Sequence, residues 1–273
     1  MGAHASGIVI DDHPDSKPAG VARTAKFPLR LERMVRAPKK LVTSDLADRA
    51  PAVGLGLDSE GVRRRLVERL RAANPHDARV LHALASVPRH RFVDAALVTQ
   101  AYEDTSLPIG HGQTISKPSV VARMLDVLMQ GANARRTGHL GRVLEIGTGC
   151  GYQAAVLCSL GRQVVSIERI RGLYDKASAN LAALGLQHLR LVYGDGMLGH
   201  APNAPYDSII AAACGAEVPQ CWLTQLAVGG RLISPVVGHA KRQTLVVVDR
   251  TEAGYQRTEH EAVQFVPLKS GSI

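Results

Sequence analysis

Aromatic residues are scarce in this 273-residue chain, at 4% of the total. A core with so few rings has to be packed from aliphatic side chains, which are plentiful from about Val80 onward. The chain also lacks any run of about 20 apolar residues, the length that a membrane-spanning helix needs. Its first residues include Asp11, Asp12 and Asp15 and no apolar segment of the kind found in secretory signals. We therefore expect a cytoplasmic protein with no membrane partner.

Cysteine is also rare, with four residues in total: Cys150, Cys158, Cys214 and Cys221. No two of them form a C-x-x-C pair, and none has a histidine at the spacing typical of zinc sites. The sequence therefore predicts free thiols in a reducing compartment and no metal site.

The formal net charge is +9, but the basic residues are dispersed rather than gathered in one run. A solvated basic surface is therefore favoured over a nucleic-acid partner. Residues 1–57 mix glycine, alanine, proline and charge without periodicity, which predicts a disordered extension. A basic stripe within it, from Arg23 to Lys40, is compatible with nucleic acid or anionic lipid, although a solvated tail is favoured. We expect one domain over residues 58–273.

The first part of that domain, residues 58–140, has the pattern of a helical preface. Ser59 is expected to cap a helix whose apolar residues recur at helical spacing, and a second helix is expected from about Asp77. The segment 108–112 is expected to be loop. Ser116 is expected to cap a further helix, with these apolar residues on one face: Val120, Val121, Met124, Leu125 and Leu128.

From residue 141 onward, strand and helix patterns alternate. The expected strands are 142–146, 163–167, 189–193, 207–212 and 230–235, and the expected helices are about 152–160, 171–184 and 219–227. Such alternation predicts an α/β fold with a doubly wound, mostly parallel sheet. Residues 244–249 and 262–266 are expected to form a terminal antiparallel pair.

A glycine-rich turn follows the first of these strands. Gly147, Gly149 and Gly151 are spaced G-x-G-x-G, and Tyr152 stands where the dinucleotide pattern G-x-G-x-x-G has its third glycine. This difference weakens the interpretation that the turn binds a nicotinamide dinucleotide. The tighter spacing after Glu145 is typical of S-adenosylmethionine binders, and a carboxylate near a cationic ligand is electrostatically reasonable.

Acidic residues end three successive strands of the predicted sheet: Glu145, Glu168 and Asp195. The carboxyl ends of parallel strands meet at one crevice, so these side chains are expected to converge there. Glu168 lies 21 positions after Gly147, where a carboxylate accepts hydrogen bonds from both ribose hydroxyls. Asp195 lies between two glycines and is expected to accept from an adenine amino group. Together they indicate a nucleoside site.

Five further blocks carry a resemblance to a known family. They are Gln113-Thr114-Ile115-Ser116-Lys117-Pro118, Val121-Ala122-Arg123-Met124, Ser166-Ile167-Glu168-Arg169-Ile170, Gly194-Asp195-Gly196 and Val263-Gln264-Phe265-Val266-Pro267-Leu268. With the glycine turn, they resemble the protein-L-isoaspartate (D-aspartate) O-methyltransferase family over about residues 60–270. The first block is the most specific, because other methyltransferases share the nucleoside loop but lack that preface.

The resemblance implies a Rossmann-like, S-adenosylmethionine-dependent methyltransferase fold, with the active-site block in residues 58–140 and the cofactor-binding core in 141–273. It implies transfer of a methyl group from S-adenosyl-L-methionine to the free α-carboxylate of L-isoaspartyl and D-aspartyl residues in damaged proteins. Isoaspartyl-containing proteins and peptides would be the substrates, and a monomer is the default expectation. Ser116 matches the family's active-site serine. The implied cofactor-binding residues are Thr114, Ile115, Glu145, Gly147, Thr148, Gly149, Gly151, Glu168, Arg169, Asp195 and Gly196.

The chemistry follows from the substrate. An α-carboxylate has a pKa near ~3.5 and is ionised at neutral pH, so no general base is required. Ser116 would then orient the carboxylate by hydrogen bonding, and as a helix cap it would also bring backbone N–H groups toward that anion.

Three positions depart from the family pattern: Cys150, Lys117 and Cys214. They bear on substrate preference and leave the cofactor assignment intact. Two alternatives stay open from the residues alone. One is an S-adenosylmethionine-dependent enzyme that methylates RNA or a small molecule, and the other is a non-enzymatic nucleic-acid-binding module on a decayed methyltransferase fold.

Overall fold

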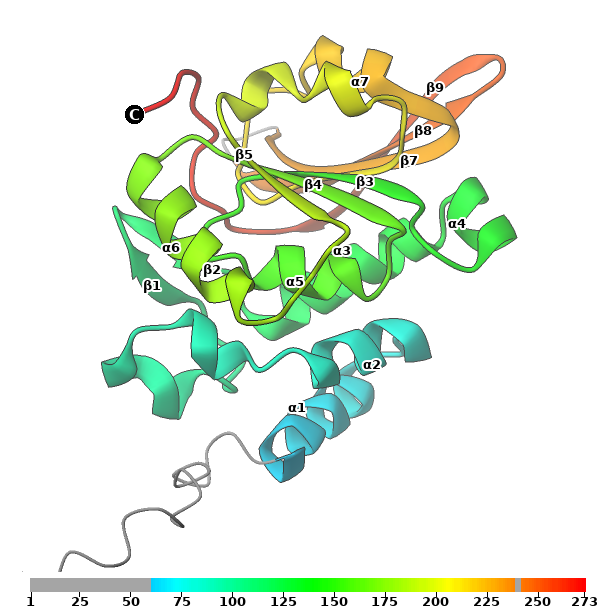
Figure 1. The fold of residues 1–273 in the computed structure, drawn as a ribbon. Helices are drawn as coiled ribbons and strands as arrows, with labels where there is room; N and C mark the ends of the chain where they lie inside the picture. Colours follow the sequence, from blue (N-terminus) through cyan, green and yellow to red (C-terminus); the bar gives the residue numbers. More distant parts are fainter. Residues whose placement is uncertain (1–59, 239–241) are drawn as a thin grey trace, which may run out of the picture. The chain divides into compact units, whose positions relative to one another are not determined.

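The computed structural model describes residues 60–238 and 242–273 (Figure 1). The predicted disordered extension, residues 1–57, and the predicted cap Ser59 lie outside these ranges. Among the described residues, none of the helices is both long enough and apolar enough to cross a membrane.

Within the described ranges, seven strands form the central sheet, in the order β5-β4-β3-β6-β7-β8-β9. Their bounds are β3 Arg142–Ile146, β4 Gln163–Glu168, β5 Leu189–Tyr193, β6 Tyr206–Ala211, β7 Leu226–Val237, β8 Gln243–Thr251 and β9 Gly254–Ala262. The first five in that spatial order run parallel, whereas β8 and β9 are each antiparallel to the strand before them. The predicted doubly wound, mostly parallel sheet with a terminal antiparallel pair is confirmed.

Alternation along the strands divides the core into two layers. Val143 and Val164 belong to one buried cluster, and their neighbours Leu144 and Val165 belong to the other. Successive side chains of a strand point to opposite faces, so each strand supplies both layers. In Figure 1, α5 (Tyr152–Cys158), α6 (Arg171–Ala182) and α3 (Pro118–Met129) lie on one face, and α7 (Gln220–Gln225) lies on the other. A sheet covered on both faces needs apolar residues on both, which explains the nearly continuous apolar strands.

The helical preface is α1 (Glu60–Ala73), α2 (Ala78–Ser86), α3 and the short α4 (Ala132–Thr137), with 3-10 turns at Arg89–Phe92 and Ala95–Gln100. Two further 3-10 turns, Gly196–Leu198 and Ala201–Asn203, follow β5. Apolar residues of α1, α2 and α3 share one buried cluster with residues of α5, β3 and β8. The preface is therefore packed onto the sheet through a common core.

Two sequence-based expectations about strands are wrong. The segment 108–112, expected as loop, holds part of a small antiparallel hairpin formed by β1 (Leu107–Gly110) and β2 (Gln113–Ile115). Its turn is made by positive φ angles at Gly110, His111 and Gly112, and the apolar alternation on either side is too short to register as strand.

The partner of β8 is Gly254–Ala262, not residues 262–266. That strand is polar along almost its whole length because it is an exposed edge strand, so hydrophobic periodicity does not reveal it. Val263 and Phe265, which suggested a strand, instead pack against the core after β9 has ended. In the same region β7 begins at Leu226, so the predicted helix 219–227 is shorter, and it ends at Gln225.

Candidate active site

A cavity of about 180 Å³ opens at the carboxyl ends of the parallel strands. Strand order reverses between β3 and β6, and the cavity is lined by residues following both, among them Gly147 and Ala212. A crevice at such a reversal is the usual ligand site of open α/β sheets. The predicted residues that line it are Thr114, Ile115, Ser116, Gly147, Thr148, Gly149, Glu168, Arg169 and Gly196.

The glycine turn has backbone angles that only glycine adopts without strain. The φ angles are 89° at Gly147, 58° at Gly149 and 92° at Gly151. The N–H groups of Gly147 and Thr148 both donate to the carbonyl of Ile167, which ties the turn to β4. A Cβ atom on Gly151 would lie 2.7 Å from Leu181 Cδ1, and Gly151 does not line the cavity. The third glycine therefore serves the packing of α5 on α6, whereas the first two face the cavity.

Glu168 is the acidic residue that reaches the cavity directly. Its side chain is buried at 4% exposure, and its carboxylate oxygens accept from the N–H groups of Gly149 and Ile170, each at 2.9 Å. A carboxylate has about four acceptor positions, so these two bonds fix its orientation and leave capacity for a ligand. The arrangement suits a group that presents two adjacent hydroxyls.

Asp195 does not line the cavity, although Gly196 does. One carboxylate oxygen of Asp195 accepts from Met197 N at 2.8 Å, and the other accepts from Gly271 N at 2.6 Å. Arg169 Nε likewise donates to the carbonyl of Gly271. Asp195 thus holds a segment, residues 266–273, that we call the C-terminal strap.

The C-terminal strap crosses the carboxyl end of the sheet. Leu268 N donates to Cys214 O beyond β6, and Ile273 exchanges backbone hydrogen bonds with the segment 169–171 beyond β4. Several strap residues line the cavity: Val266, Pro267, Leu268, Lys269 and Ile273. Sequence reasoning did not assign them to the site, because their placement depends on pairing between distant segments.

Glu145 is fully buried and does not line the cavity. Its carboxyl group accepts from Ser166 Oγ at 2.6 Å and from Gln153 Nε2 at 3.0 Å. Burial raises its pKa to about 8, with the two hydrogen bonds acting in the opposite direction. The predicted role beside a cationic ligand is therefore replaced by an indirect one. Ser166 also pairs with Thr148, which does line the cavity, at 2.6 Å.

Ser116 lies where the cavity meets a second and larger one of about 1190 Å³. Both cavities are lined by Ser116 and Thr114, and the larger forms a groove between α3 and the segment 261–266. Within the described ranges, no hydrogen bond involves the hydroxyl of Ser116. This hydroxyl is therefore free to serve a ligand at the junction.

The expectation that Ser116 caps α3 is wrong. The helix begins at Pro118, its N-cap is Lys117, and no side chain of the cap residue bonds to it. Asp104 takes the capping role from another segment, since its Oδ1 accepts from Ser119 N at 2.8 Å. Pro118 has no N–H, and Val120 N donates to Lys117 O. The first N–H groups of α3 are consequently occupied and are not open to an anion.

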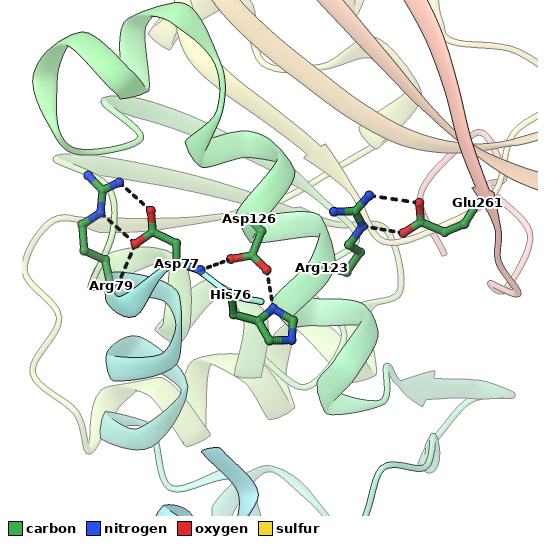
Figure 2. A network of polar contacts seen from close by, with 6 residues as sticks. All are labelled: His76, Asp77, Arg79, Arg123, Asp126 and Glu261. Atoms are coloured by element: carbon green, nitrogen blue, oxygen red, sulfur yellow. Dashed lines mark hydrogen bonds and ion pairs between the residues drawn. The ribbon is translucent and has the colours of Figure 1, made fainter. Parts of the chain in front are cut away.

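The walls of the groove are joined by polar contacts between segments far apart in the chain (Figure 2). Asp126 on α3 accepts from the backbone N–H of Asp77 at 2.9 Å and pairs with the ring of His76. Arg123, one turn earlier on α3, pairs with Glu261 at the end of β9 at 2.7 Å. His76, Arg123 and Glu261 all line the groove, so these contacts hold its walls together.

The comparisons with known proteins agree on one family. Residues 62–273 match the family model described as "Protein-L-isoaspartate(D-aspartate) O-methyltransferase (PCMT)". The chain is 55% identical over 271 residues to the protein-L-isoaspartate O-methyltransferase of Methylibium petroleiphilum, which covers 93% of this chain and 99% of that protein. It is 59% identical over 238 residues to the protein of the same name from Leptothrix cholodnii, covering 86% of this chain and 83% of that protein.

Solved structures show the same likeness. A protein-L-isoaspartate O-methyltransferase matches with a TM-score of 0.68 and 28% identity, over 76% of this chain and 66% of that one. A Plasmodium falciparum protein, described as a putative protein-L-isoaspartate O-methyltransferase in complex with S-adenosyl-L-homocysteine, matches with a TM-score of 0.63 and 23% identity. It covers 76% of this chain and 98% of its own, and at that identity the match supports the fold alone.

Proposed function

Because the chain belongs to the protein-L-isoaspartate (D-aspartate) O-methyltransferase family, we propose that it repairs damaged proteins by methylating isoaspartyl residues. The methyl group moves from S-adenosyl-L-methionine to the free α-carboxylate of L-isoaspartyl, and D-aspartyl, residues. The position of Ser116 carries the assignment, because its free hydroxyl lies at the junction of a nucleoside-sized cavity and a peptide-sized groove.

The residues of the smaller cavity fit S-adenosylmethionine. Gly147 and Gly149 bring backbone close to the cavity without a side chain, and a Cβ atom on Gly149 would lie 3.1 Å from Ile109 Cδ1. The oriented carboxylate of Glu168 suits the ribose hydroxyls. We assign the cofactor to these residues together with Thr114, Ile115, Thr148, Arg169 and Gly196. Three further predicted residues do not line the cavity and support its walls through packing and hydrogen bonds: Gly151, Glu145 and Asp195.

Ser116 is the proposed catalytic residue. When bound, S-adenosylmethionine supplies a methyl group on a positively charged sulfur. Ser116 Oγ would donate to one oxygen of the substrate carboxylate and aim the other at that methyl carbon, with no proton to remove. Residues of the hairpin β1–β2 and of the C-terminal strap line the cavity. A bound substrate that displaced water from it would favour a reaction that neutralises opposite charges.

The groove is the proposed seat of the protein substrate. Its walls come from the connection between α1 and α2, from α3 and from the end of β9, and it runs up to Ser116. We accordingly propose that residues 58–140 mainly hold the substrate and active-site block, and that residues 141–273 mainly hold the cofactor. We further propose a monomer. We also propose a cytoplasmic location, which is consistent with four free cysteines in the described residues.

One assay tests the proposed activity. Purified protein is given S-adenosylmethionine with a labelled methyl group and one of three acceptors: an isoaspartyl peptide, its normal aspartyl twin, or RNA. We expect label in the isoaspartyl peptide alone, and we expect mild base to release it because a carboxyl methyl ester hydrolyses readily. Base-stable label, or label in RNA, would assign the chain to another methyltransferase class.

A further inference from the structure

A buried arginine lies directly behind Ser116. Arg89, in the 3-10 turn Arg89–Phe92, has an exposed fraction of 0%. Its Nε donates to Ala101 O at 2.8 Å and its Nη2 donates to Ser116 O at 2.7 Å. Arg89 lines neither cavity, so it reaches a ligand only through the wall that Ser116 forms.

Among the described residues, the positive charge of Arg89 has no ion-pair partner. Within residues 60–238 and 242–273, no carboxylate forms an ion pair with it, and its Nη1 has no hydrogen-bond partner. The guanidinium stacks at 4.7 Å from the centre of the Tyr152 ring, which is uncharged. Burial lowers the pKa of Arg89, yet an arginine side chain stays protonated in proteins. An unpaired buried charge is costly to a fold and calls for a counter-charge.

Asp104, a carboxylate that acts on Arg89 through space, is already committed elsewhere. Asp104 contributes a weak favourable interaction with Arg89. Its side chain is 44% exposed, it caps α3 through Ser119 N, and it lies 3.9 Å from the ammonium group of Lys117. Water and these partners screen its charge, so Asp104 compensates the buried guanidinium only in part.

The ligand expected at Ser116 carries the negative charge that would balance the guanidinium of Arg89. The substrate's α-carboxylate is an anion, and the first N–H groups of α3 are already occupied. Resting on the proposed function, we propose that Arg89 is a positioning residue whose unpaired buried charge selects an ionised carboxylate at Ser116 and fixes the backbone of that serine.

This placement predicts an effect on binding more than on chemistry. The carboxylate is fully charged before transfer and loses charge as the ester forms, so Arg89 favours the bound substrate over the transition state. Loss of its charge should therefore raise KM without lowering kcat. The neutral methyl ester gains nothing from Arg89, which also favours product release.

The test compares two peptides that differ in one charge. One contains an isoaspartyl residue, and the other is its analogue with a neutral α-carboxamide in place of the α-carboxylate. Affinities of both are measured by fluorescence anisotropy with saturating S-adenosylhomocysteine. For unit charges about 7–10 Å apart at an effective dielectric constant of about 20, Coulomb's law predicts a preference of roughly 15- to 60-fold for the carboxylate in the wild type.

Variants then locate the source of that preference. R89Q and R89M are two neutral replacements of different shape, and both should lose most of the preference for the carboxylate peptide. R89K keeps the positive charge, so the logarithm of its affinity ratio should be at least about half that of the wild type. Arg231→Gln is the matched control, because Arg231 is paired with Asp249 and also donates to a backbone carbonyl, that of Val127. It removes the same formal charge and should leave the preference unchanged.

The outcomes separate this proposal from the proposed function. A wild type that methylates the isoaspartyl peptide but binds the two peptides within about threefold overturns the role of Arg89 with no variant needed. Full preference in folded R89Q or R89M, or loss of preference in folded R89K, overturns it too. A wild type that transfers no methyl group to the isoaspartyl peptide instead contradicts the proposed function.

Discussion

At the scale of single residues, two glutamates only 23 positions apart have opposite environments. Glu168 is oriented by two backbone N–H groups and reaches the cavity, whereas Glu145 is sealed beneath it among Ser166 and Gln153. Full burial disfavours an ionised carboxylate at Glu145. The same residue type therefore serves ligand binding at one strand end and internal structure at the other.

The buried position of Glu145 predicts a pH-dependent stability. Its pKa is raised from 4.5 to about 8, so the proton that it binds stabilises the fold fully below pH 4.5. That contribution is lost as the pH rises through 8. Glutamine imitates the protonated acid, so Glu145→Gln should gain stability relative to the wild type between pH 5 and 8, at up to about 1.4 kcal/mol per pH unit.

Urea denaturation at several pH values measures this effect. The same substitution at the exposed Glu217 is the control and should not gain stability with pH. A difference between Glu145→Gln and the wild type that stays constant from pH 5 to 8 would show that Glu145 is ionised in the folded protein.

The hydroxyl of Ser116 has no hydrogen-bond partner within the described residues, so its removal should cost activity more than stability. Ser116→Ala should lower the rate of methyl transfer by roughly 10²-fold, as expected for the loss of one oriented donor. Calorimetric affinity for S-adenosylhomocysteine should change little. Ser119→Ala, on the same groove but with only its backbone N–H engaged in capping, is a matched control. Equal rates for Ser116→Ala and the wild type would remove Ser116 from the mechanism.

At the scale of elements, the N-terminus of α3 depends on a distant cap. Asp104 lies 15 positions from Ser119, whose N–H it accepts at 2.8 Å. Such a cap stabilises a helix by about 0.5–2 kcal/mol. Asp104→Ala should therefore destabilise the protein by about that amount in chemical denaturation.

An exposed ion pair provides the comparison for Asp104→Ala. Asp94 has a side chain that is 58% exposed and pairs with Lys176 at 2.8 Å, so Asp94→Ala should cost less than Asp104→Ala. If Asp94→Ala and Asp104→Ala lower the free energy of unfolding by the same small amount, Asp104 does not act as a cap in solution.

At the scale of the whole molecule, the helical preface and the sheet share one hydrophobic cluster that runs from α1 to β8. Elements that share a core unfold together, so we expect a single thermal transition for the described part of the chain. The active-site block and the cofactor-binding core therefore have different functions but unfold as one unit. The same packing fixes the position of Ser116 relative to Glu168.

Binding of the reaction product should stabilise this unit as a whole. At 100 times its dissociation constant, S-adenosylhomocysteine should add about 2.7 kcal/mol, which raises Tm by roughly 5–10 °C for a domain of this size. Scanning calorimetry measures the shift, with adenine alone as the control ligand. Gly149→Val should abolish the shift, because valine resists the positive φ of 58° and its Cβ would press on Ile109. A shift of the same size in Gly149→Val would place the nucleoside elsewhere.

Local patterns in the sequence determined the order of strands and helices, the glycine turn and the acidic end of β4. Each of these depends on a short-range cause: side-chain periodicity, the positive φ of Gly147, or the position of Glu168 at the end of its strand. The family also followed from the sequence, because the block around Ser116 is specific to it. The edge strand β9 and the hairpin β1–β2 escaped prediction, since neither has a sustained apolar alternation.

Only the tertiary structure decided which of these residues face the cavity. Glu145 points away from the cavity because it lies on the face of β3 that α5 covers. Asp195 accepts a hydrogen bond from Gly271, 76 positions away. The cap of α3 comes from Asp104 rather than from Ser116. The unpaired charge of Arg89 behind Ser116 is equally invisible in the sequence. Burial and hydrogen-bond partners are set by contacts between distant segments, and those contacts determine whether a carboxylate or guanidinium binds a ligand or supports the fold.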